Sequence, residues 1–206
     1  MSRLVPIVCL AAATGFGPAL AQPRSDPDWP CVQRKQPTIS AGAVWSGPDL
    51  ASAGPWTQDF PAAALAQRLA SRRTDLAEAD RLIEEFARDA GPDRTQKLTR
   101  VFAGVLELVN AERDRIIGGI TRYARGQRLL AERIREEGDR IGAVRNAPGG
   151  EGPKELGELE TRFAWDKRVF EERNQALQYV CEAPVMLEQR LFEIGRKIQE
   201  RLAAPG

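Results

Sequence analysis

Residues 156–198 read LGELETRFAWDKRVFEERNQALQYVCEAPVMLEQRLFEIGRKI, and a seven-residue repeat runs through the whole stretch. One row of the repeat holds Leu156, Phe163, Phe170, Leu177, Pro184, Leu191 and Ile198, and its partner row holds Leu159, Asp166, Arg173, Val180, Leu187 and Ile194. Ten of these thirteen positions carry apolar side chains other than proline, which indicates a long helix buried along one stripe against another helix. The pattern predicts that this helix starts near Pro153 and that Pro184 either kinks it or divides it in two.

A second long helix is predicted upstream, from Asp93 to about Val144, and the breaker segment NAPGGEGP at residues 146–153 separates the two helices. Its apolar stripe is predicted to run through Leu98, Phe102, Val105, Val109, Glu112, Ile116, Ile120, Tyr123, Gln127, Leu130 and Ile134. Two helices of roughly 50 residues joined by so short a loop pair antiparallel, and each arm is then roughly 75 Å long. The repeat in residues 156–198 would equally serve pairing with a second copy of the chain, which the sequence leaves open.

A further helical stretch begins at Pro61, which suits the first position of a helix with Asp59 as a nearby cap, and it ends at Gly91-Pro92. The sequence does not decide whether this helix is interrupted between Ser71 and Thr74, because Thr74 followed by Asp75 and Glu78 resembles the start of a new helix. We therefore predict an all-α fold over residues 61–206: an elongated antiparallel three-helix bundle and coiled-coil hairpin with its tip near 146–153.

Residues 22–60, which precede the helices, form a segment rich in proline and tryptophan. The prolines are Pro23, Pro27, Pro30, Pro37, Pro48 and Pro55, and they exclude a long helix in favour of extended and turn structure. Trp29, Trp45 and Trp56 lie among them, whereas a disordered segment would hold few aromatic residues. We predict an ordered non-helical strap whose indole rings anchor it to the helices, with a tryptophan-lined ligand or partner site as the alternative.

The first 21 residues have the features of a cleavable signal peptide. Arg3 supplies a positive start, an apolar run follows, and Ala19-Leu20-Ala21 matches a small-x-small cleavage site before Gln22. An uncleaved amino-terminal anchor is the alternative. Export predicts a periplasmic location, and no stable membrane span is expected after cleavage.

Cleavage would leave two cysteines, Cys31 and Cys181, in an oxidising compartment where disulfides persist. Antiparallel pairing places residues opposite one another. A hairpin that turns near Gly150 brings Cys181 beside Gly119. A first turn near Pro92 brings Pro61, the start of the preceding helix, beside Tyr123. The strap would then enter the bundle at the level of Cys181. We predict a Cys31–Cys181 disulfide, with a pair of reactive thiols or a soft-metal site as the alternatives.

Composition argues against several functions. The chain has no histidine, so it lacks Ser-His or Cys-His nucleophiles and the usual zinc ligand sets. Of its 30 basic residues only Arg3 lies in 1–21, so the remainder carries 29 basic and 29 acidic side chains. This neutral charge argues against nucleic acid as the main partner. We expect no catalytic activity, no metal and no cofactor.

The hairpin tip is the predicted interaction region, because residues 124–176 have no third helix to cover them. Its most informative patch is Trp165-Asp166-Lys167-Arg168: Trp165 either covers the neighbouring helix or anchors a partner. The leading hypothesis is an exported adaptor or spacer that binds another protein through the hairpin or associates with itself. The alternative is a small-ligand-binding module that uses the strap tryptophans Trp29, Trp45 and Trp56.

The stretch DWPCVQRKQPTISAGAVWSGP, residues 28–48, resembles the start of exported proteobacterial proteins that have no assigned activity. The resemblance covers about a tenth of the chain, implies a location outside the cytoplasm, and carries no catalytic motif.

Overall fold

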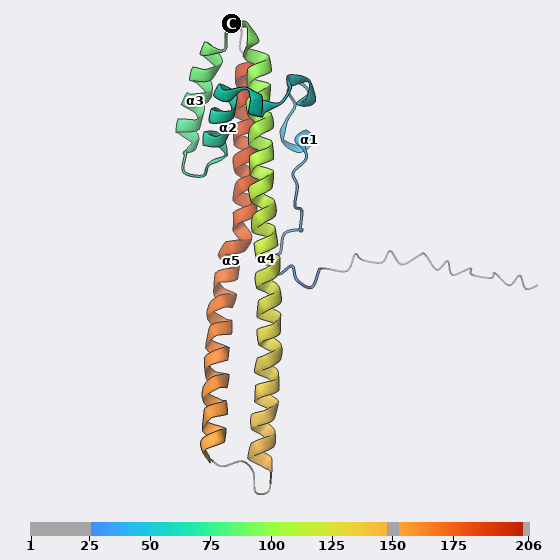
Figure 1. Ribbon diagram of the computed structural model, residues 1–206, viewed down its shortest axis with the longest axis vertical. Coiled ribbons are helices and arrows are strands. Elements are labelled where there is room, and N and C mark those ends of the chain that lie inside the picture. Colours follow the sequence, from blue (N-terminus) through green and yellow to red (C-terminus); the bar gives the residue numbers. More distant parts are fainter. Residues whose placement is uncertain (1–25, 148–152, 204–206) are drawn as a thin grey trace, which may run out of the picture.

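The structure, a computed structural model, describes residues 26–147 and 153–203 (Figure 1). The predicted signal peptide at 1–21, the first four residues of the predicted strap and most of the hairpin tip lie outside the described residues. Every regular element within them is helical, which confirms the all-α fold.

Two long helices form the body of the molecule. Helix α4 spans Arg94–Asn146 and helix α5 spans Pro153–Ala203, and they lie side by side and antiparallel along the long axis (Figure 1). The elongated hairpin is thus confirmed. Pro184 lies inside α5 without dividing it. Its carbonyl oxygen accepts a hydrogen bond of 3.1 Å from Arg113 Nη1. Proline interrupts the hydrogen bonding of a helix, and here a buried side chain of α4 stabilises α5 at the same residue.

The predicted helix over 61–90 is two helices. Helix α2 (Phe60–Ala70) begins after Asp59, which accepts the backbone N–H of Ala62 at 3.1 Å, and α3 (Leu76–Asp89) begins after Asp75, which accepts that of Glu78 at 2.7 Å. The two acidic caps explain the starts, because each satisfies a backbone donor that the first helical turn leaves unpaired.

This break overturns one sequence estimate. A continuous helix would have carried Pro61 to the level of Tyr123, but the chain reverses between α2 and α3. Pro61 instead lies beside Arg100, whose Nη1 is 3.1 Å from Asp59 Oδ2. The strap therefore runs along most of the upper hairpin before α2 begins.

The strap has no long helix, but it contains three single turns: α1 (Ala41–Val44), η1 (Ala51–Ala53) and η2 (Trp56–Gln58). The prediction of an entirely non-helical segment to residue 60 was wrong in this detail. The intervals between prolines admit one turn each while still excluding a longer helix. A last short turn, η3 (Gly91–Asp93), connects α3 to α4.

The main core lies in the upper half of the hairpin, where α2 and α3 pack on one side of α4 and α5 and the strap packs on the other (Figure 1). Its largest fully buried side chains are Phe102, Leu69, Ile83, Leu98, Leu187, Leu191, Ile194, Ile198, Val101, Val105 and Val109. The Phe102 ring stacks on Trp45 of the strap at a centroid separation of 4.2 Å.

The stripe of α4 departs from its predicted course after Val109. Arg113 and Ile117 are buried there, whereas Glu112 and Ile116 are only partly buried. After Val109 the next two buried positions, Arg113 and Ile117, each follow four residues later instead of alternating three and four. A helix of 3.6 residues per turn permits this spacing. Arg113 is tolerated in this position because it binds the Pro184 carbonyl and lies 3.6 Å from Glu188.

Replacing Gly195 by alanine is expected to lower the free energy of unfolding. The steric clash costs about 1–3 kcal/mol, and the higher helix propensity of alanine offsets about 1 kcal/mol of that cost. A Cβ at Gly195 would lie 2.8 Å from the Val44 carbonyl oxygen and 3.0 Å from a Phe102 ring carbon. Urea unfolding followed by circular dichroism measures the change.

Gly142→Ala is the matched control, because a Cβ there meets nothing within 4 Å. It should stabilise the helix by about 0.5–1 kcal/mol. Equal effects of the two substitutions would contradict the close approach of strap to α5.

Candidate interaction surface

The disulfide predicted from the sequence is present in the structure. Cys31 and Cys181 are bonded, with their Cα atoms 5.5 Å apart, and both pack against Ile120 of α4. The hairpin register placed Cys181 beside Gly119, one residue from the observed neighbour. Gln33 of the strap donates from its side-chain amide to the Cys181 carbonyl, so the strap is held here by a covalent and a polar contact.

Polar contacts fix the strap to the helices on both sides of the disulfide. Asp28 is buried and accepts from Arg125 Nε at 2.9 Å and from Arg128 Nη2 at 3.0 Å. Asn110 uses its amide to bind both the N–H of Ile39, at 2.9 Å, and its carbonyl, at 3.0 Å. Further along, the backbone N–H of Ser46 donates to Gln199 at 2.7 Å. Asp28, Ile39 and Ser46 lie in the strap predicted from the sequence, but their partners on α4 and α5 were not predicted.

The three strap tryptophans are spread along the hairpin. Trp29 packs beside the disulfide, Trp45 is buried against Phe102, and Trp56 lies against Gly104 of α4. Each indole N–H has an acceptor at 2.7 Å: the Gln33 carbonyl for Trp29, the Pro48 carbonyl for Trp45 and Glu107 for Trp56. The rings do not line one common site, and their polar edges are already bonded.

Trp165 is exposed. Its side chain retains 61% of its accessible surface, and Arg168 lies over the ring at 5.7 Å. The interpretation that Trp165 covers the neighbouring helix was therefore wrong. The adjacent Asp166 takes the buried position and binds Arg133 of α4 at 2.6 Å, which turns Trp165 outward.

Residues 124–146 of α4 and 153–176 of α5 form what we call the distal arm, which lies beyond α2–α3 and contacts the strap at its start, where Asp28 binds Arg125 and Arg128. Figure 1 shows it extending past the other described elements. Side chains of α4 bind backbone carbonyls of α5 along this region: Tyr123 to Arg173 at 2.7 Å and Gln127 to Phe170 at 3.1 Å. These bonds hold the two helices in one register without a large apolar core.

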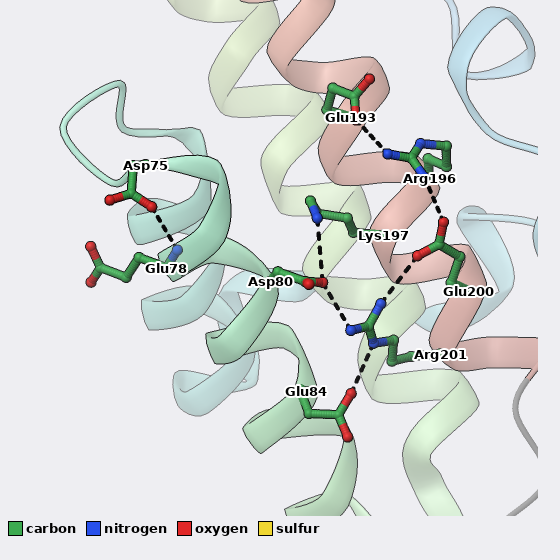
Figure 2. A network of polar contacts seen from close by, with 9 residues as sticks. All are labelled: Asp75, Glu78, Asp80, Glu84, Glu193, Arg196, Lys197, Glu200 and Arg201. Atoms are coloured by element: carbon green, nitrogen blue, oxygen red, sulfur yellow. Dashed lines mark hydrogen bonds and ion pairs between the residues drawn. The ribbon is translucent and has the colours of Figure 1, made fainter.

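Helix α3 is attached to the carboxyl-terminal end of α5 by ion pairs (Figure 2). Asp80 lies 2.9 Å from Arg201 and 3.5 Å from Lys197, and Glu84 lies 3.0 Å from Arg201. The neighbouring Arg196 binds Glu193 and Glu200, which raises its pKa. The α2–α3 pair is thus confined to the upper hairpin.

Few ionisable groups are perturbed. Burial lowers the pKa of Arg190, whose Nε donates to the Leu69 carbonyl at 2.9 Å, and the hydrogen bond from Lys35 lowers the pKa of Asp26.

Residues 26–147 and 153–203 contain no group of three or more acidic or cysteine side chains arranged to hold a metal ion. None of the helices in the same residues contains an apolar stretch long enough to cross a bilayer.

Comparison of the chain with protein-family models, with curated proteins and with solved structures finds no match.

Proposed function

We propose that this chain is an exported interaction or structural protein, an adaptor or spacer, built on a disulfide-anchored helical hairpin and without catalytic activity. The distal arm is its binding element. The periplasm is the proposed location, since a structural disulfide there needs no protection from reduction.

The observation that carries this proposal is the contrast between the two halves of the hairpin. The upper half is covered on one side by α2–α3 and on the other by the strap. Below the Asp28 contacts with Arg125 and Arg128, no described element covers the distal arm, which exposes Trp165 and Leu129 at 61% and 58% of their accessible surface. Exposed aromatic and aliphatic side chains on a rigid support are typical of protein-binding surfaces.

The alternative, a small-ligand site on the strap tryptophans, has less support. Such sites enclose most of a ligand and converge a few free polar groups on it. The indole groups of Trp29, Trp45 and Trp56 lie at separate levels and have their donors occupied.

The test compares the full chain with a shortened chain in which residues 126–172 are replaced by a short glycine-rich turn. The shortened chain should keep its fold, because the main core and the disulfide lie outside the removed segment. Immobilised full chain should retain a partner from periplasmic extract, and the shortened chain should lose it. Direct titration of the purified partner against both chains then gives the affinity.

Circular dichroism and the melting temperature of the shortened chain provide the control for folding. Equal retention of the partner by both folded chains would contradict the role of the distal arm. A partner lost only when the strap tryptophans are replaced would favour the alternative.

A further inference from the structure

Helix α5 carries a second heptad seam in addition to the one that packs on α4. Its members alternate four and three residues apart, and six of the seven are apolar: Trp165, Val169, Glu172, Ala176, Tyr179, Ala183 and Met186. The largest of them are exposed, with 61% of Trp165, 77% of Tyr179 and 53% of Met186 accessible. A sustained 4-3 alternation of this kind is the pattern of a helix that packs against a partner helix.

The second seam continues a face that is already an interface higher up. The seven-residue row of Val169, Ala176 and Ala183 passes next through Arg190 and Lys197. Arg190 donates to the Leu69 carbonyl of α2 at 2.9 Å, and Lys197 lies 3.5 Å from Asp80 of α3. The α2–α3 cover ends at its connecting loop, and below that loop the same face of α5 has no described helix on it.

Helix α4 leaves room beside this seam. A Cβ added at Gly119 or Gly126 would meet nothing within 4 Å. Leu108 and Arg115 line the groove under the α2–α3 loop, and their seven-residue row leads on to the exposed Leu129. The uncovered face therefore spans both helices, and on α4 it holds glycines, the apolar Leu108 and Leu129, and the arginines Arg115 and Arg122 of the same row.

The two ends of this face carry opposite charge. At the upper end a groove of about 750 Å³ is lined by Arg72, Arg73, Arg115 and Glu112 around Leu108 and Met186; Arg115 pairs with Glu112, so Arg72 and Arg73 give the groove its net positive charge. Arg72 and Arg73 are exposed, and no carboxylate in the described part of the chain pairs with either.

At the lower end, Glu155 and Glu158 are exposed in the first turns of α5, in the same two rows of the repeat as Val169 and Trp165; with the exposed Arg162 of the first row they give this end a net negative charge. A basic upper end and an acidic lower end on one face are complementary to the same face of a second copy turned end for end.

We propose that two copies of this chain associate antiparallel through the second seam, so that each distal arm continues the α2–α3 layer of the other. The tip of each arm then reaches the arginine groove under the partner's α2–α3 loop. In this register Trp165 packs on the partner's Ala176, a large residue against a small one. The inference rests on the proposed interaction function and names its partner as a second copy.

The dimensions suit such a pairing. The uncovered part of α5, from Pro153 to Met186, is roughly 50 Å long at 1.5 Å per residue. A strip of that length and two helices wide covers roughly 1,000 Å² if each helix is about 10 Å across. Stable interfaces take about 800 Å² from each partner. Full overlap of two arms therefore supplies enough area without displacing α2 or α3.

Sedimentation velocity of the full disulfide-bonded chain tests the proposal, and a dimer is expected. Ala176→Arg should raise the dissociation constant at least about 100-fold, because a long charged side chain replaces a methyl group inside the interface at two symmetric places. The side chain of Ala176 is exposed in the single chain, so this variant should fold. Ala164→Arg is the matched control: Ala164 is equally exposed on α5 but lies outside the seam, and its change should leave the dimer intact.

A charge exchange tests the antiparallel arrangement. Glu155→Lys with Glu158→Lys should weaken the dimer about tenfold, and adding Arg72→Glu with Arg73→Glu to the same chain should restore it. Glu171→Lys with Asp89→Lys makes the same charge change at exposed positions outside the seam and should leave the dimer unaffected.

A monomer at about 100 µM, where even weak dimers form, would overturn the proposal. A dimer that Ala176→Arg leaves intact, or a charge exchange without recovery, would do the same. If the chain is monomeric but Ala176→Arg abolishes capture of a different protein, self-association is wrong and the proposed interaction function stands. If the chain is monomeric and shortening the arm changes no binding, both are wrong.

Discussion

Replacing Phe102 by alanine is expected to lower the free energy of unfolding by about 3–5 kcal/mol. The ring is fully buried at the centre of the main core and stacks on Trp45 at 4.2 Å with an interplanar angle of 10°. Its removal leaves a cavity bounded by α4, α5 and the strap, and it ends an aromatic contact that itself contributes about 0.5–1.5 kcal/mol. Domains of ordinary stability have about 5–15 kcal/mol in total, so the loss would be a large share.

Urea unfolding followed by tryptophan fluorescence and by circular dichroism measures this change, and Trp45, one of four tryptophans that contribute to the fluorescence, loses its contact with the ring. Phe192→Ala is the control on the same hairpin, since that ring is 50% exposed and should cost less than about 1 kcal/mol. Equal effects at the two positions would contradict the placement of Phe102 between strap and helices.

Replacing both Cys31 and Cys181 by serine is expected to destabilise the protein by about 2–4 kcal/mol. The bond closes a loop with a sequence separation of 150 residues. For a loop of that length the chain-entropy account gives about 5 kcal/mol, and measured values are commonly lower. The difference in unfolding free energy between the oxidised protein and the double variant measures the effect.

The loss should be concentrated at one end of the strap. Contacts of Ile39 with Asn110 and of Ser46 with Gln199 remain in the variant and hold the later part of the strap. Hydrogen exchange should therefore accelerate at residues 26–38 more than at 39–59. Reductant should destabilise the unaltered protein to the same extent and leave the double variant unchanged. A change below about 0.5 kcal/mol would contradict a stabilising disulfide.

Much of the candidate site followed from local pattern. The repeat through Phe163, Phe170 and Leu177 indicated the helix and its stripe, and the short breaker fixed the antiparallel register that brought Cys181 to Ile120. The repeat did not decide whether Trp165 covers the neighbouring helix or is exposed. Heptad rows show which positions of a helix face another helix, but not how many helices pack against it. A second seam beside the first becomes informative only when its side chains are seen to be exposed.

The sequence by itself determined the all-α hairpin and the pairing of its cysteines. The sevenfold spacing of apolar residues, the short loop between the long helices and the two cysteines outside residues 1–21 each restrict the chain to few arrangements. Tertiary structure alone decided that Arg113 is buried, that the chain reverses between α2 and α3, and that Trp165, Tyr179 and Met186 of the second seam are exposed. Those outcomes depend on contacts between residues far apart in the chain, such as Arg113 with Pro184 and Arg190 with Leu69, which no local pattern encodes.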